Sequence, residues 1–186
     1  MPARIPLAPL DEAERLAVEI GIPAVTGRLN VFRMMALDPV VARAIFTQHN
    51  VLRHGGKLPD LLRELIIMRI AWLEKSEYEW AQHWTISQKL GIDAQVVLAV
   101  RNWRDSDHFG SRECAVLAAV DDTLESGMIA DNTWQACVSA LGSTDAMIEL
   151  VAAIGHWSSL ARLFRSFAVP LEDGMTSWPP DGLVPS

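Results

Sequence analysis

Two acids and an imidazole lie within the most apolar part of this chain. Glu64 occurs in the run LPDLLRELIIMRIAWL, and His83 follows nineteen residues later, flanked by tryptophans. A second acid, Glu79, precedes His83 by four residues, which is about one turn of an α-helix. A carboxyl group and an imidazole at this spacing can deliver and remove a proton. This spacing favours an acid–base site with Glu79 and His83, and Glu64 of the preceding helix is a further candidate for it.

Two helices must position these side chains. The first begins near Leu58-Pro59-Asp60, because proline fits the first turn of a helix. Apolar residues at spacings of three and four follow, and Glu64 lies on their face between Leu61 and Met68. A carboxylate in that position must be hydrogen-bonded or protonated, because burying a bare charge is costly.

The second helix is expected to span residues 76–90. Ser76 is suited to cap it, Glu79 three residues on completes a capping box, and Gly91 suits its end. One face of this helix carries a set of polar and aromatic residues at helical spacing: Ser76, Glu79, Trp80, His83 and Ser87. The capping box offers Glu79 a structural role as the alternative to a catalytic one.

The segment 58–92 resembles the carboxymuconolactone decarboxylase family, which includes the AhpD-like alkylhydroperoxidases. The resemblance rests on Arg63-Glu64, Arg69-Ile70-Ala71, Tyr78-Glu79-Trp80-Ala81-Gln82-His83 and Leu90-Gly91-Ile92, and extends loosely to Gly155-His156-Trp157 and residues 167–171. It implies an all-α, multi-helix bundle of the AhpD-like type that forms homo-oligomers. It also implies that Glu64 is a proton-relay acid and that His83 is the histidine of the site.

The peroxidase members of that family carry a Cys-x-x-Cys pair on the second helix, just before the histidine. The resemblance places those two positions on Ser76 and Glu79, so both thiols are missing here. A hydroxyl and a carboxylate cannot reduce a peroxide through a sulfenate. We therefore expect decarboxylase-like chemistry, a decarboxylation or a proton shift on a small organic acid or lactone, with no cofactor and no metal.

Further residues are expected to contact the substrate of this site. An arginine, Arg53 or Arg63, would hold a substrate carboxylate, and His49 and His54 lie within reach just before the core helices. The other predicted substrate contacts follow from the helix face and from the resemblance: Ser76, Tyr78, Trp80 and His156.

Other interpretations of these residues stay open at this point. Glu64 can pair with Arg63 or Arg69 in a surface salt bridge, and His83 can simply pack between tryptophans. The protein would then be a catalytically silent oligomeric scaffold or a small-ligand binder. A third interpretation is a residual peroxidase activity that uses Cys114 or Cys137.

Composition restricts the class of protein. Half of the 186 residues are hydrophobic and the net charge is −7, which argues against a nucleic-acid surface. Two separated cysteines are typical of free thiols in a reducing compartment. The sequence shows neither a signal-peptide pattern nor an uninterrupted apolar span, so we expect a cytoplasmic protein with a small-molecule substrate and no membrane partner.

The chain is expected to form one domain over residues 1–186, a bundle of about eight helices. Its core motif is 58–92. Residues 1–10 are expected to form an arm that frays or drapes over a neighbouring subunit, and residues 170–186 an irregular tail.

Overall fold

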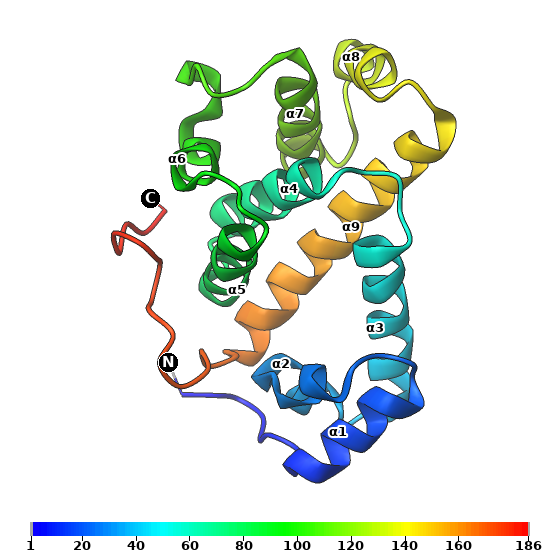
Figure 1. Ribbon diagram of the computed structural model, residues 1–186, viewed down its shortest axis with the longest axis vertical. Coiled ribbons are helices and arrows are strands. Elements are labelled where there is room, and N and C mark those ends of the chain that lie inside the picture. The colour runs from blue at the N-terminus through cyan, green and yellow to red at the C-terminus, as the bar shows by residue number, and fades with distance from the viewer. Residues whose placement is uncertain (1, 186) are drawn as a thin grey trace.

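The computed structural model describes residues 2–185, which form helices and no strand (Figure 1). The prediction of an all-α bundle is confirmed, with one α-helix more than expected in the described range. The α-helices are α1 (Leu10–Glu19), α2 (Asn30–Met35), α3 (Pro39–His54), α4 (Asp60–Leu73), α5 (Glu77–Lys89), α6 (Ala94–Ala99), α7 (Ser111–Ser126), α8 (Asp131–Leu141) and α9 (Thr144–Phe167). Two 3₁₀ helices, η1 (Ala24–Arg28) and η2 (Val100–Asp105), connect them. None of the helices within residues 2–185 is long and apolar enough to cross a membrane.

Helix α4 is buried on every side. It packs against α5, α7 and α9, and Figure 1 shows α9 running diagonally through the molecule beside it. One side of α4 joins the larger hydrophobic core through Leu62, Ile66 and Ile70, and another side joins a smaller core through Leu65 and Met68. The expected single apolar face is therefore too narrow a description, because α4 has protein around its whole circumference.

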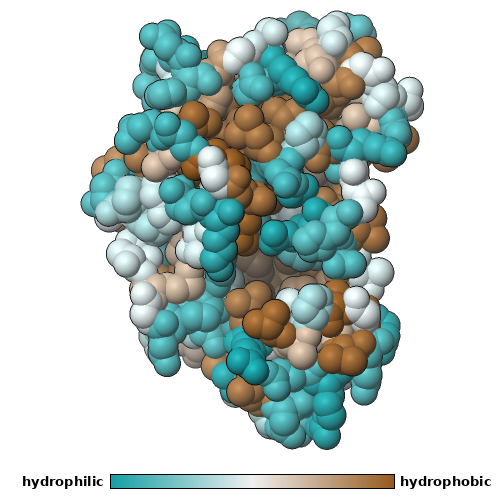
Figure 2. Space-filling view, in the orientation of Figure 1, coloured by the Kyte–Doolittle hydropathy of each residue, from teal (hydrophilic) through white to brown (hydrophobic). Residues whose placement is uncertain are grey.

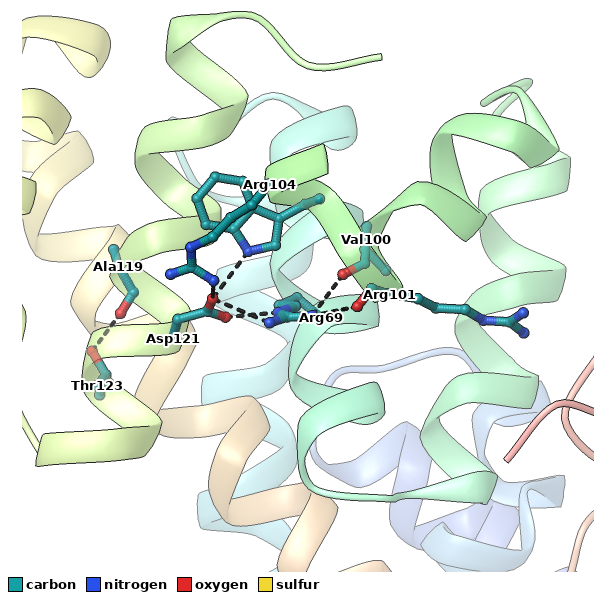
Figure 3. A network of polar contacts seen from close by, with 8 residues as sticks. Arg69, Val100, Arg101, Arg104, Ala119, Asp121 and Thr123 are labelled. Carbon is teal, nitrogen blue, oxygen red and sulfur yellow. Dashed lines mark hydrogen bonds and ion pairs between the residues drawn. The ribbon is translucent and has the colours of Figure 1, made fainter. Parts of the chain in front are cut away.

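The burial of α4 requires partners for its charged residues. Figure 3 shows Arg69 of α4 bound to both oxygens of Asp121 on α7, at 2.7 and 3.1 Å. Arg69 also donates to the carbonyls of Val100 and Arg101, and Trp103 and Arg104 donate to the same carboxylate. Arg69 is thus committed to η2 and α7, and the predicted alternative of an Arg69–Glu64 surface pair is wrong.

Burial of Asp121 acts to raise its pKa, but this is not the net result. The hydrogen bonds and the positive charge of Arg69 outweigh the burial and hold the pKa of Asp121 below its usual range. The carboxylate therefore stays ionised and ties α4, α7 and η2 together.

Replacing Asp121 by asparagine should reveal the energy of this network. Asp121→Asn leaves the Arg69 guanidinium buried without a counter-charge, and such a change costs about 3–5 kcal/mol. We expect a loss of about 3 kcal/mol in urea unfolding, because Arg69 keeps its two carbonyl acceptors. Glu125→Gln, at an exposed position of the same helix, is the control. Equal unfolding free energies for the two variants would contradict the assignment.

The irregular tail after α9 is fixed to the bundle. Trp178 is buried, and its ring lies 6.1 Å from the rings of both Trp72 and Trp80. Trp80 donates its indole N–H to the carbonyl of Pro179 at 2.7 Å. The tail therefore completes the smaller core, and only Ser186 of the predicted tail lies outside the described residues.

The N-terminal arm also packs on its own chain. The backbone N–H of Arg4 donates to the carbonyl of Phe167, and that of Ala8 to the carbonyl of Arg33. The expectation that this arm frays or drapes over a neighbour is corrected for residues 2–9, since these backbone bonds hold it against α2 and α9. Met1 lies outside the described residues.

Removing the indole of Trp178 should test whether the tail contributes to stability. We expect Trp178→Ala to cost about 3 kcal/mol in urea unfolding, at the low end for a buried aromatic residue because the tail can partly collapse. Leu183→Ala, where the side chain is 53% exposed, should change the stability far less. A variant as stable as wild type would show that the tail is not part of the cooperative core.

Candidate functional site

The side chains of Glu64 and His83 meet inside the bundle. The Nδ1 atom of His83 lies 2.7 Å from Oε2 of Glu64, and both residues are at most 5% exposed. The short turn between α4 and α5, where Lys75 has a left-handed backbone with φ of 54°, brings the two helices together. When Nδ1 carries the proton it donates to the carboxylate, and Nε2 is then the nitrogen open to a ligand.

His83 lines a small cavity of about 70 Å³. Helices α3 and α5 supply its polar walls, and apolar side chains from α2, α9 and the segment around η1 close it. The polar lining residues are Thr26 at η1 and, on the two helices, His49, Arg53, Tyr78, Glu79, Gln82 and His83. A neighbouring depression of about 140 Å³ shares His49 and Arg53 with it. Figure 2 shows this face of the molecule hollowed between the N-terminal helices and the rest of the bundle, with apolar residues at the bottom.

Glu79 faces the cavity as an unpartnered acid. It is 1% exposed, and neither carboxyl oxygen has a hydrogen-bond partner within residues 2–185. Burial first, and then the charges of Glu74 and Glu64, raise the pKa of Glu79 well above its usual value. The neutral acid is therefore favoured, and Glu79 can act as a proton donor.

The predicted capping box at the start of α5 is wrong. The Ser76 side chain accepts no bond from the helix, and Glu79 does not turn back toward the Ser76 backbone. Instead the backbone N–H of Ser76 donates to the carbonyl of Ala71, which fixes the turn without its hydroxyl. Both polar side chains are left without a structural hydrogen bond.

Arg53, and not Arg63, is the arginine that faces the cavity. Its Nε atom is buried and has no partner within residues 2–185. Burial lowers the pKa of Arg53, and the charge of Glu64 opposes that shift. Arg63 is instead bound to Asp60 at 2.5 Å and lies 3.9 Å from Oε1 of Glu64. Glu64 is thus in a buried cationic setting rather than in a surface salt bridge.

His156 stands behind the cavity wall. Its Nε2 lies 3.3 Å from Nδ1 of His49, which does line the cavity. Burial lowers the pKa of His156 to about 4, and burial together with the charge of His156 lowers the pKa of His49. Both imidazoles are neutral at pH 7. The sequence placed His49 within reach of the site. Its spacing of four residues from Arg53 puts both side chains on the same face of one helix, which is the pattern that could have identified it as a lining residue.

Tyr78 and Trp80 point to different surroundings. Tyr78 lines the cavity and donates its hydroxyl to Oε1 of Glu172 at 2.5 Å. Gln82 donates to the other oxygen of the same carboxylate. Trp80 does not line the cavity, because its ring packs 5.4 Å from that of Trp72 in the smaller core. The role of Glu172 was missed, since no local pattern connects the tail to α5.

No group of three or more histidine, cysteine and acidic side chains within residues 2–185 is arranged to hold a metal ion.

The sequence model of the carboxymuconolactone decarboxylase family matches residues 39–122, so this segment belongs to that family, as the motif predicted. It runs from α3 into α7 and includes Glu64, Glu79 and His83. No curated protein matches the chain.

Solved structures with the same fold cover nearly the whole chain. The AhpD core of a peroxidase-related protein from Ralstonia eutropha JMP134 has 19% identity and a TM-score of 0.76, over 93% of this chain and 94% of that one. A peroxidase-related protein from Silicibacter sp. TM1040 has 18% identity and a TM-score of 0.73, over 92% and 93%. The debrominase Bmp8 in complex with 2,3,4-tribromopyrrole has 17% identity and a TM-score of 0.72, over 93% and 94%. At these identities the likeness establishes an AhpD-like helical fold.

The pH dependence of stability should reveal the buried acid. The pKa of Glu79 is raised in the folded state above the value of 4.5 for an ordinary glutamate. The stability that this carboxyl group contributes is therefore fully present below the ordinary pKa and is lost as pH rises toward the folded pKa. Glu79→Gln has the same shape and cannot ionise. We expect its stability relative to wild type to increase from about pH 5 to about pH 8 in urea unfolding.

Glu12→Gln, at an exposed position of α1, is the control and should differ from wild type by a constant amount. If the Glu79→Gln difference is equally flat, the carboxyl of Glu79 is not held in its neutral form.

Proposed function

We propose that the His83 cavity is an acid–base active site for a small organic acid or lactone. The observation that carries this proposal is the set of unused hydrogen-bonding groups on residues that line one cavity. These are Nε of Arg53, both oxygens of Glu79 and Nε1 of Trp157. Buried polar groups in native proteins nearly always have a partner, so an anionic or carbonyl-bearing ligand that engages them together fits the site.

Each side chain has a distinct role in the proposed reaction. Arg53 binds a carboxylate of the substrate, and Nε2 of His83 removes a proton from carbon. Glu64 is a positioning residue, because it fixes the ring through Nδ1 and stabilises the protonated imidazole. Glu79 delivers the compensating proton.

Two reaction types use this set of groups. In a proton shift, one carbon loses its proton to His83 and a second carbon gains one from Glu79. In a decarboxylation, the bond to the departing carboxylate breaks, carbon dioxide leaves, and the electron pair remains on carbon until Glu79 or protonated His83 supplies a proton. The family match to residues 39–122 supports the second type and suggests carboxymuconolactone-like compounds as first substrates.

A thiol peroxidase has little support in the site. Ser76 and Glu79 occupy the positions where the peroxidase motif has cysteines. Cys137 is buried and donates to the carbonyl of Ala115, and burial raises the pKa of its thiol to about 11. Reduction of a peroxide needs a thiolate, which this environment disfavours.

The small cavity favours a second candidate function, a non-catalytic small-ligand binder or oligomeric scaffold. Its volume of about 70 Å³ is far below the ~300–1,000 Å³ typical of ligand sites, so a substrate has to extend into the neighbouring depression beside Arg53. Homo-oligomerisation itself stays a prediction.

Removing the imidazole should separate these candidates. His83→Ala is expected to lower turnover of carboxymuconolactone, or of an active compound from a panel of related lactones and small carboxylic acids, by about 10²–10⁴-fold. His108→Ala, in an exposed loop, is the control and should keep full activity. Circular dichroism should show that both variants are folded.

Glu64→Gln should retain part of the activity and shift the pH profile, because it changes the group that holds the ring. An active and folded His83→Ala variant would overturn the catalytic proposal. Stabilisation of wild type by a compound that is never turned over would favour the binder.

A further inference from the structure

We propose that a second pocket, at the start of α5, binds a small organic anion with an apolar body. This pocket has a volume of about 440 Å³, which is within the range of ordinary ligand sites. Its walls come from the N-terminal arm, the α4–α5 turn, the end of α9 and the first residues of the tail. Nothing in the proposed acid–base reaction uses it.

Three cationic side chains from separate segments converge on this pocket. Arg4 belongs to the arm, Lys75 to the turn and Arg165 to the last turn of α9. Within residues 2–185 none of them is in an ion pair. The two arginines donate only to carbonyl oxygens, Arg4 to Ser166 at 3.1 Å and Arg165 to Glu74 at 2.8 Å. These bonds hold them in place and leave their charges unneutralised, in a chain whose net charge is −7.

The start of α5 adds hydrogen-bond donors to the same pocket. The first N–H groups of a helix have no acceptor within it, and they favour an anion. Ser76 lines the pocket, is fully buried, and has a hydroxyl without a partner within residues 2–185. No side chain caps this thirteen-residue helix. The unused hydroxyl is an observation independent of the three cations, and both features favour an acceptor group from a ligand.

The remaining lining residues define the rest of the ligand. Phe164, Val169 and Leu171 make one wall apolar. Glu77 also lines the pocket and would repel an anion, but it is one carboxylate against three cations, and it accepts a bond from the hydroxyl of Ser177 in the tail. An aryl or acyl group against the apolar wall, with a carboxylate or phosphate beside the cations, matches this division.

This pocket is separate from the His83 cavity but shares a wall with it. Tyr78 and Phe164 line both, with ring centroids 5.3 Å apart in an edge-to-face contact. None of the three cations lines the His83 cavity, and neither His83 nor Arg53 lines the anion pocket. The two proposals can therefore fail independently.

Calorimetric titration of the full chain with phenyl phosphate, benzoate and inorganic phosphate tests the proposal. We expect saturable binding of phenyl phosphate or benzoate, weakened by added salt. The double variant Lys75→Gln/Arg165→Gln should lower the affinity about tenfold or more, since it removes two charge-assisted contacts. The control Arg15→Gln/Lys89→Gln changes the net charge equally at exposed positions outside the pocket, and should stay within about twofold of wild type.

Ser76→Ala gives a second measurement that does not alter charge. Its hydroxyl bonds nothing within residues 2–185, so the variant should fold as wild type does and bind the anion about threefold or more weakly. The preferred probe identifies the head group, phosphate monoester or carboxylate.

Three results would overturn the proposal. The first is no saturable binding of any probe to wild type. The second is binding of inorganic phosphate as tight as that of the aryl probes, which would remove the apolar half of the argument. The third is binding lost in Arg53→Gln and kept in Lys75→Gln/Arg165→Gln, which would move the anion to the His83 cavity.

Discussion

Burial of α4 on every side is the constraint on which the rest of this structure depends. Among the buried charged residues of this helix are Arg69 and Glu64, which lie inside two hydrophobic cores. An unpaired buried charge strongly destabilises a folded protein, so both residues pair with a side chain on a neighbouring element. Arg69 forms an ion pair with Asp121 and so holds α7 and η2 against α4. Glu64 contacts Nδ1 of His83 and so holds α5 against α4.

The two partnerships differ in how completely they satisfy the groups involved. The Asp121 network uses both carboxylate oxygens and spreads over four donors, so it is closed and structural. Around His83, by contrast, one oxygen of Glu64, both oxygens of Glu79 and Nε of Arg53 have no hydrogen-bond partner within residues 2–185. Unsatisfied groups of this kind lower stability. Their concentration beside one cavity, which the Asp121 network lacks, supports the proposed functional role of this region.

The C-terminal tail positions side chains of this region although it has no regular secondary structure. Glu172 accepts bonds from Tyr78, from Gln82 and from the backbone of Asn30, and so joins the tail to α5 and α2. Tyr78 is thereby fixed between two pockets, one facing His83 and the other facing the cations at the start of α5. The wall between the proposed acid–base site and the proposed anion pocket therefore depends on a carboxylate ninety-four residues away from the tyrosine.

The sequence by itself determined the helical class, because helical periodicity is a local property, and its resemblance to a known family indicated the pairing of Glu64 with His83. It could not determine which of several possible hydrogen-bond or ion-pair partners each polar group would have. The capping box at Ser76 was the locally favoured choice, yet Glu79 faces a cavity whose other walls come from α3 and α9. Trp80 lies in a core completed by Trp178, and Arg53 faces the cavity where Arg63 does not. These outcomes were decided only by the tertiary structure, because burial and electrostatic partnership depend on segments that are distant in sequence and adjacent in space.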